Sequence, residues 1–117
     1  MQKTIKTTIP RDLLKRYKSQ IGIKGKDFGI LQIRKMFLVA VEDFKNKNIS
    51  VEEFSSICHF LFGKIVKNNL LQKDKNLFGA ILAGSELDYY RTQSKNTKQY
   101  KDFSDEVFAY YKSKKIK

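Results

Sequence analysis

The sequence predicts a mainly α protein with one short N-terminal β-strand followed by about five helices. Residues 3–9 alternate between two sets of side chains, which is the period of a strand: Ile5, Thr7 and Ile9 on one face, Thr4, Lys6 and Thr8 on the other. After Pro10, apolar residues recur at spacings of three and four, the period of an α-helix. We expect the strand and the second helix to join two copies of the chain in a dimer, because a lone strand is marginally stable.

The 117 residues carry a net charge of +12 that is unevenly distributed. Residues 1–48 hold 12 Lys/Arg against 4 Asp/Glu, residues 49–91 hold 5 against 5, and residues 92–117 hold 7 against 3. A neutral middle between two basic ends suggests a core or oligomer interface flanked by surfaces for polyanions. The same lysine excess, beside many Asn and Ile residues, is typical of an AT-rich genome, so both interpretations of the charge stay open.

The first helix is expected from about Pro10 to Gln20. Pro10 cannot donate to a β-ladder but suits the first turn of a helix. One apolar stripe then follows at helical spacing, made of Leu13, Leu14, Tyr17 and Ile21. Gly22 and Gly25 mark a turn after it.

The second helix is expected from Asp27, as its N-cap, to about Lys45. It is too apolar for a helix with one exposed face, which predicts contacts on more than one side, as in a dimer core. The third helix opens on a capping box, Ser50-x-x-Glu53.

The fourth helix is expected over about 74–91, with Gly84 as a candidate break that Ser85 would recap. A polar, basic, loop-like segment separates it from the last helix, which is expected over about 103–112. The chain thus divides into a basic segment 1–48, a helical segment 49–112 that shares or extends the core, and a basic mobile tail 113–117.

The run TIKTTIPRDLLKRYKSQIGIKG resembles the start of a ribbon-helix-helix domain of the Arc and Met repressor family, over residues 3–45. The shared pattern is a short alternating strand ending in an apolar residue and Pro, a Leu-rich helix, a Gly turn and a second amphipathic helix. The resemblance implies that two strands, one from each subunit, pair and lie in the major groove of duplex DNA. Asp27 departs from the family, whose second helix begins at a phosphate clamp.

The resemblance implies two sets of DNA contacts. Short polar and basic side chains on the outer face of the strand would contact bases: Thr4, Lys6 and Thr8. Basic residues in the helix and the turn would contact phosphates: Arg11, Lys15, Lys24 and Lys26. The predicted function is that of a small non-enzymatic DNA-binding regulator or accessory factor, whose partners are duplex DNA and a second copy of itself.

A second run, NISVEEFSSICHFLF, more weakly resembles a helix opening in small helical colicin-type immunity proteins, over residues 46–91. It implies the alternative function, a helical bundle that binds a protein partner through residues 49–112. Immunity proteins against nucleases tend to be acidic because they cover basic active sites, whereas this chain is basic.

Nothing in the sequence predicts an enzyme. No phosphate-binding loop, nucleophile elbow, zinc-protease motif or pair of catalytic carboxylates is present. Cys58 and His59 are single residues in an apolar run, where a small buried hydrophobe and a partly buried structural side chain are expected. We expect no cofactor, no metal, no membrane span and a cytoplasmic location.

Overall fold

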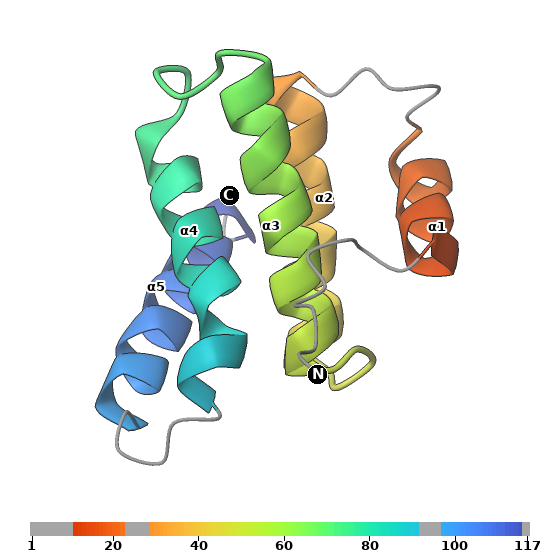
Figure 1. Ribbon diagram of the computed structural model, residues 1–117. Helices are drawn as coiled ribbons and strands as arrows, with labels where there is room; N and C mark the ends of the chain where they lie inside the picture. The colour runs from red at the N-terminus through yellow and green to blue at the C-terminus, as the bar shows by residue number, and fades with distance from the viewer. Residues whose placement is uncertain (1–10, 23–28, 92–96, 116–117) are drawn as a thin grey trace, which may run out of the picture.

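The computed structural model describes residues 11–22, 29–91 and 97–115 (Figure 1). These residues form five helices: α1 Arg11–Ile21, α2 Ile30–Lys45, α3 Val51–Lys67, α4 Lys75–Arg91 and α5 Thr97–Lys115. None of the described helices is long and apolar enough to cross a membrane.

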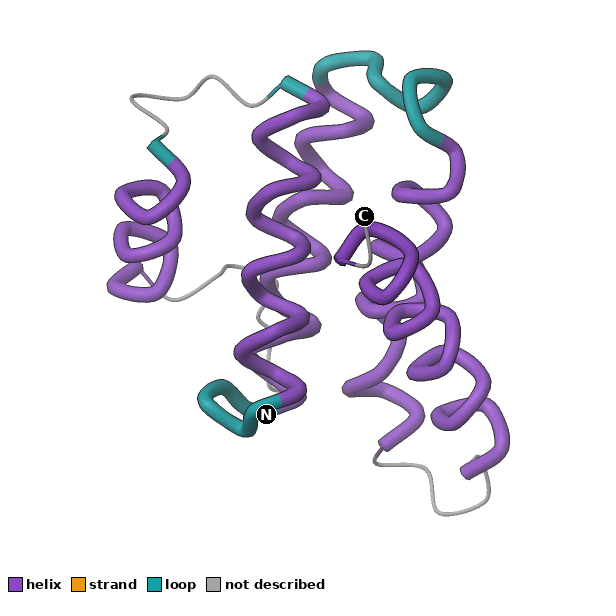
Figure 2. The backbone as a smooth tube through the Cα atoms, turned by 180° about the vertical axis from the view of Figure 1, so that it is seen from behind, coloured by secondary structure: helices purple, strands orange, loops and turns teal. Residues whose placement is uncertain are grey.

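The predicted fold class is wrong in one respect, because the described residues form an all-α fold with no strand among them (Figure 2). The strand expected over residues 3–9 lies outside the described residues. Helices alone enclose the described core, whose residues all lie in α1–α5 except Ile49, which lies in the loop before α3. The long helical periodicities therefore determine this core, and no sheet contributes to it.

Helices α2 to α5 form an up-and-down bundle in which each helix runs antiparallel to the next (Figure 1). Close contacts join α2 to α3, α3 to α4, α4 to α5, and α5 back to α2. Buried aromatic and aliphatic side chains fill the centre, among them Phe37, Phe54, Leu61 and Leu77, each with 0% of its surface exposed. This antiparallel order decides which charged helix ends meet.

Most apolar residues of α2 are covered within one chain, because α1, α3 and α5 all pack against this helix, while Leu31 remains 56% exposed. The strand-and-helix dimer expected from its composition is therefore not needed to bury it. α1 lies outside the bundle and is anchored to α2 by Tyr17, whose fully buried ring places its hydroxyl 2.6 Å from Oδ2 of Asp43. Burial, with the nearby Asp43 carboxylate, raises the pKa of Tyr17 above its ordinary value.

The predicted capping box of α3 is confirmed. The Ser50 hydroxyl accepts from the Glu53 N–H at 3.1 Å, and the Glu53 carboxylate accepts from the Ser50 N–H at 2.8 Å. α2 differs from the prediction, because it begins at Ile30 after Gly29, and the expected cap Asp27 lies outside the described residues.

The last two helices compare differently with their predictions. α4 spans the predicted range and continues through Gly84, the candidate break. α5 begins at Thr97, about six residues earlier than expected, in the segment predicted to be a loop. Two ion pairs one turn apart, Lys98–Asp102 and Lys101–Asp105, each 2.9 Å long, line its first turns. Such pairs favour a helix even where apolar residues are sparse.

Candidate functional site

The bundle separates its charges along its long axis. The antiparallel order brings together residues 30–37, 60–82 and 107–115, which we call the basic end. This end holds nine Lys/Arg against one Asp/Glu. Its helices are tied together at Asp74, whose Oδ2 lies 2.9 Å from the Arg34 guanidinium and 3.4 Å from the Tyr110 hydroxyl.

The opposite half of the bundle consists of residues 38–59, 83–91 and 97–106, which we call the acidic end. It holds nine Asp/Glu against five Lys/Arg. Residues 49–91, which are neutral when counted along the chain, therefore divide between two ends of opposite sign once they are folded.

Most lysines of the basic end extend into solvent, where they are available to a partner. The exposed side chains come from all three segments of this end: Lys35, Lys67, Lys73, Lys75, Lys112 and Lys114. Lysines have long, flexible stems and bear a compact positive charge. A surface of this kind attracts polyanions.

Asp74 is the single carboxylate of the basic end, and the fold neutralises it. Its Oδ1 accepts the Leu77 N–H at 3.1 Å, which caps the start of α4, while Arg34 pairs with its Oδ2. Burial acts to raise the pKa of Asp74, but the Leu77 and Arg34 hydrogen bonds outweigh it, so the pKa lies below the ordinary value. A polyanion at this end therefore meets a carboxylate already paired with a guanidinium.

A groove of about 300 Å³ lies between the start of α4 and the last turns of α5. Lys75 and Asn76 line it and offer ammonium and amide donors, while Ser113, which also lines it, donates its hydroxyl to the Tyr110 carbonyl at 2.8 Å. Glu106 from the acidic end also lines the groove. The donor set suits phosphate oxygens, with Glu106 restricting where they can lie.

Several carboxylates of the acidic end are held in contacts within the chain. Asp43 bonds to Tyr17, and Glu42 accepts from the Tyr111 hydroxyl at 2.9 Å. Glu53 caps α3, and Asp102 and Asp105 pair with lysines of α5. Acidic groups thus stabilise the fold, while the lysines of the other end face outward.

Most of the DNA-contact residues expected from the sequence lie outside the described part of the chain. Thr4, Lys6, Thr8, Lys24 and Lys26 lie outside the described residues, and so does the side chain of Arg11. Lys15 is exposed on α1, which is anchored at Asp43, in the half of α2 away from Arg34.

The residues of the basic end were not expected from the sequence. They are dispersed over three separate segments. When charges are counted along consecutive stretches of the sequence, these basic residues are cancelled by the carboxylates of the acidic end. Helices joined by short loops usually pack antiparallel. Counting the charges of each helix half, and combining the halves that meet in such a bundle, would have located these residues.

Within the described ranges, no three His, Cys, Asp or Glu side chains gather as a metal site would require. Cys58 is fully buried, as expected, and burial raises the pKa of its thiol well above the ordinary value, which leaves it protonated and unreactive. Comparisons with protein-family models, with curated proteins and with solved structures give no match. The function is therefore argued from charge and geometry.

Proposed function

We propose that the protein is a non-enzymatic nucleic-acid-binding protein that holds duplex DNA by its phosphates through the basic end. The observation that carries the proposal is the separation of charge, with nine Lys/Arg and a single, neutralised carboxylate at one end of the bundle. A lysine surface that contacts phosphates releases counterions from DNA, and this release supplies most of the affinity in binding without sequence preference.

The proposal differs from the ribbon-helix-helix expectation in where the DNA lies. Exposed lysines at helix ends reach phosphates without entering a groove, so they fix position and affinity but carry no sequence information. The basic end offers ammonium groups together with the Asn76 amide, and it offers no planar guanidinium aimed at bases, because Arg34 is paired with Asp74. Binding that is largely independent of sequence follows from this composition.

A pair of matched variants tests the proposal. Lys73→Gln/Lys75→Gln removes two exposed charges at the basic end, and Lys98→Gln/Lys101→Gln removes two at the acidic end. Anisotropy of a labelled blunt duplex at low salt should show about tenfold weaker binding for the first variant. The second should bind nearly as the wild type does.

Circular dichroism of both variants provides the control for folding. Equal weakening by the two variants would mean that net charge, and not the basic end, governs binding. Failure of the wild-type protein to bind the duplex at low salt would end the proposal outright.

A further inference from the structure

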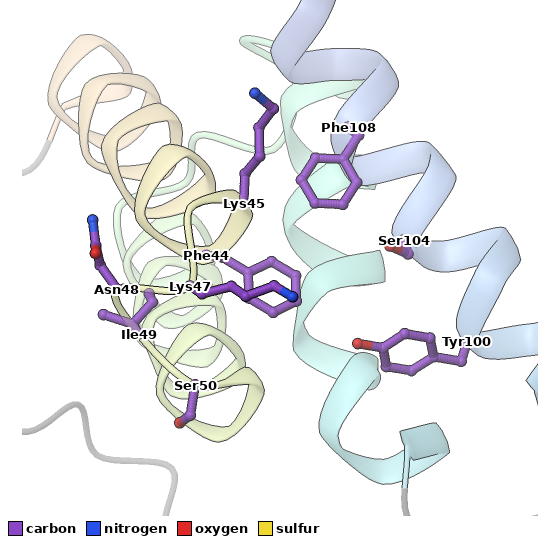
Figure 3. A pocket seen from close by; sticks show the side chains of 9 residues that line it. All are labelled: Phe44, Lys45, Lys47, Asn48, Ile49, Ser50, Tyr100, Ser104 and Phe108. Carbon is purple, nitrogen blue, oxygen red and sulfur yellow. The ribbon is translucent and has the colours of Figure 1, made fainter.

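A pocket of about 590 Å³ lies mainly at the acidic end, between the turn that joins α2 to α3 and residues 100–108 of α5 (Figure 3). Phe44, Tyr100 and Phe108 supply aromatic walls, and Lys45 and Lys47 supply two ammonium groups. Its volume is in the range of small-molecule sites. We propose that this pocket binds a nucleotide unit, with the base against the aromatic rings and the phosphate on the two lysines. The proposal is independent of DNA binding at the basic end.

The rings are arranged to extend a stack. Phe44 lies parallel to Phe54 with ring centroids 4.6 Å apart, and parallel to Phe108 with centroids 6.0 Å apart. Phe54 is fully buried, while Phe44 and Phe108 are half-buried and line the pocket. Figure 3 shows Phe108, Ser104 and Tyr100 in succession along α5, opposite the side of the pocket that carries Phe44. A planar base can stack on such rings whatever its identity.

The charge of the pocket decides the sign of its ligand. The acidic end as a whole holds nine Asp/Glu, yet none of the nine described residues that line the pocket is acidic. The carboxylates of the same turn of α2 are held elsewhere, Glu42 by Tyr111 and Asp43 by Tyr17. Lys45 and Lys47 are exposed, and Asn48 and Ser104 add polar groups. The pocket is a locally cationic site that suits a phosphate.

The backbone conformation of Lys47 is an independent indication that this residue belongs to the proposed site. Its φ of 64° lies in the left-handed region, which costs a side-chain-bearing residue free energy. The position follows the C-cap Asn46, and the Lys47 and Asn48 N–H groups bond to the Phe44 and Asp43 carbonyls at 3.1 and 2.8 Å. Helix ends of this geometry usually carry Gly or Asn there. In this chain the position holds a lysine that extends from the turn toward α5 (Figure 3).

Adenosine monophosphate is the first probe. Its binding is detected by NMR of the Phe44, Tyr100 and Phe108 rings. Adenosine and ribose 5-phosphate each lack half of the ligand, and each should bind about tenfold more weakly, since one stacked base or one charge-assisted hydrogen bond accounts for such a factor. Equal binding of ribose 5-phosphate and adenosine monophosphate would overturn the aromatic part of the proposal. No shift of these rings at millimolar nucleotide would overturn all of it.

Lys47→Gly is the decisive variant because it removes an ammonium group and relieves the left-handed strain at once. It should melt at or above the wild-type temperature and bind the nucleotide about tenfold more weakly. The matched control Lys73→Gln/Lys75→Gln should retain nucleotide binding while losing duplex binding. Unchanged nucleotide affinity in Lys47→Gly would contradict the assignment of the phosphate.

Two competitors identify the source of the nucleotide. One outcome is that a single-stranded oligonucleotide displaces adenosine monophosphate more strongly than an equal concentration of mononucleotide does. That outcome supports the proposal and identifies the ligand as an unpaired base of a strand. Displacement by mononucleotides alone supports it with a free nucleotide. Binding of an acidic peptide with an aromatic residue, by a protein that does not bind the nucleotide, would overturn it in favour of a protein ligand.

Discussion

The Ser55 hydroxyl on α3 donates to the Gly84 carbonyl on α4 at 2.9 Å, and it accepts the Asp88 N–H at 3.0 Å. Residues 84 and 88 are the pair that an α-helix joins directly by its own hydrogen bond. A side chain from a neighbouring helix thus bridges two groups of one helical turn at Gly84, the candidate break through which α4 continues.

Replacing Ser55 tests this bridge. Ser55 is 3% exposed, so Ser55→Ala would leave buried polar groups to find new partners. We expect the free energy of unfolding to fall by about 1–3 kcal/mol, as measured by urea denaturation. Ser55→Thr, which keeps the hydroxyl, serves as the comparison. An unchanged free energy in Ser55→Ala would show that the α4 ladder closes without the hydroxyl.

Gly84 allows α3 and α4 to approach closely. A Cβ at this position would lie 2.5 Å from Sγ of Cys58 and 3.0 Å from the Phe54 ring. Gly84→Ala should therefore destabilise the protein by about 1–3 kcal/mol through overpacking. In a thermal melt, Cys58→Ala should recover part of that loss in the double variant, because it removes the nearer atom. Strictly additive effects of the two substitutions would contradict this contact.

Asp74 makes stability depend on pH in the acid range. Its pKa is lowered in the folded protein, so the unfolded chain binds the proton more readily, and the contribution of the carboxylate to stability increases with pH. That contribution should be complete above about pH 4, the ordinary value for an aspartate, and should be lost as the pH falls through the lower folded-state pKa.

Asp74→Asn isolates this effect because the other titrating groups are shared by both proteins. The variant should be less stable than the wild type at neutral pH, and the difference should shrink as the pH drops below about 4. Denaturant midpoints at several pH values measure it. A difference that stays constant from neutral to strongly acid pH would mean that the carboxylate charge does not stabilise the fold.

The helices and much of the core could be predicted from the sequence, because apolar periodicity and the Ser50 capping box are local patterns. The alternating pattern of residues 3–9 is also local, but it does not determine whether the fold contains a sheet with which a strand could pair. The early start of α5 was missed because its first turns rest on Lys–Asp pairs and not on apolar residues.

The candidate site depends on tertiary arrangement, so counts along consecutive stretches of the sequence do not reveal it. Arg34, Asp74 and Tyr110 meet at one end of the bundle although they come from separate helices and the loop before α4. The pocket at the other end likewise combines Phe44 with Phe108, which are 64 positions apart in the sequence. Neither grouping follows from composition or from spacing.

The salt dependence of duplex binding tests the central claim most directly. Each lysine that contacts a phosphate contributes close to one unit to the slope of log K against log salt concentration. We predict that Lys67→Gln/Lys73→Gln/Lys75→Gln reduces the steepness of that slope by roughly two to three units relative to the wild type. An unchanged slope in this variant, with its fold intact, would contradict DNA binding through the basic end.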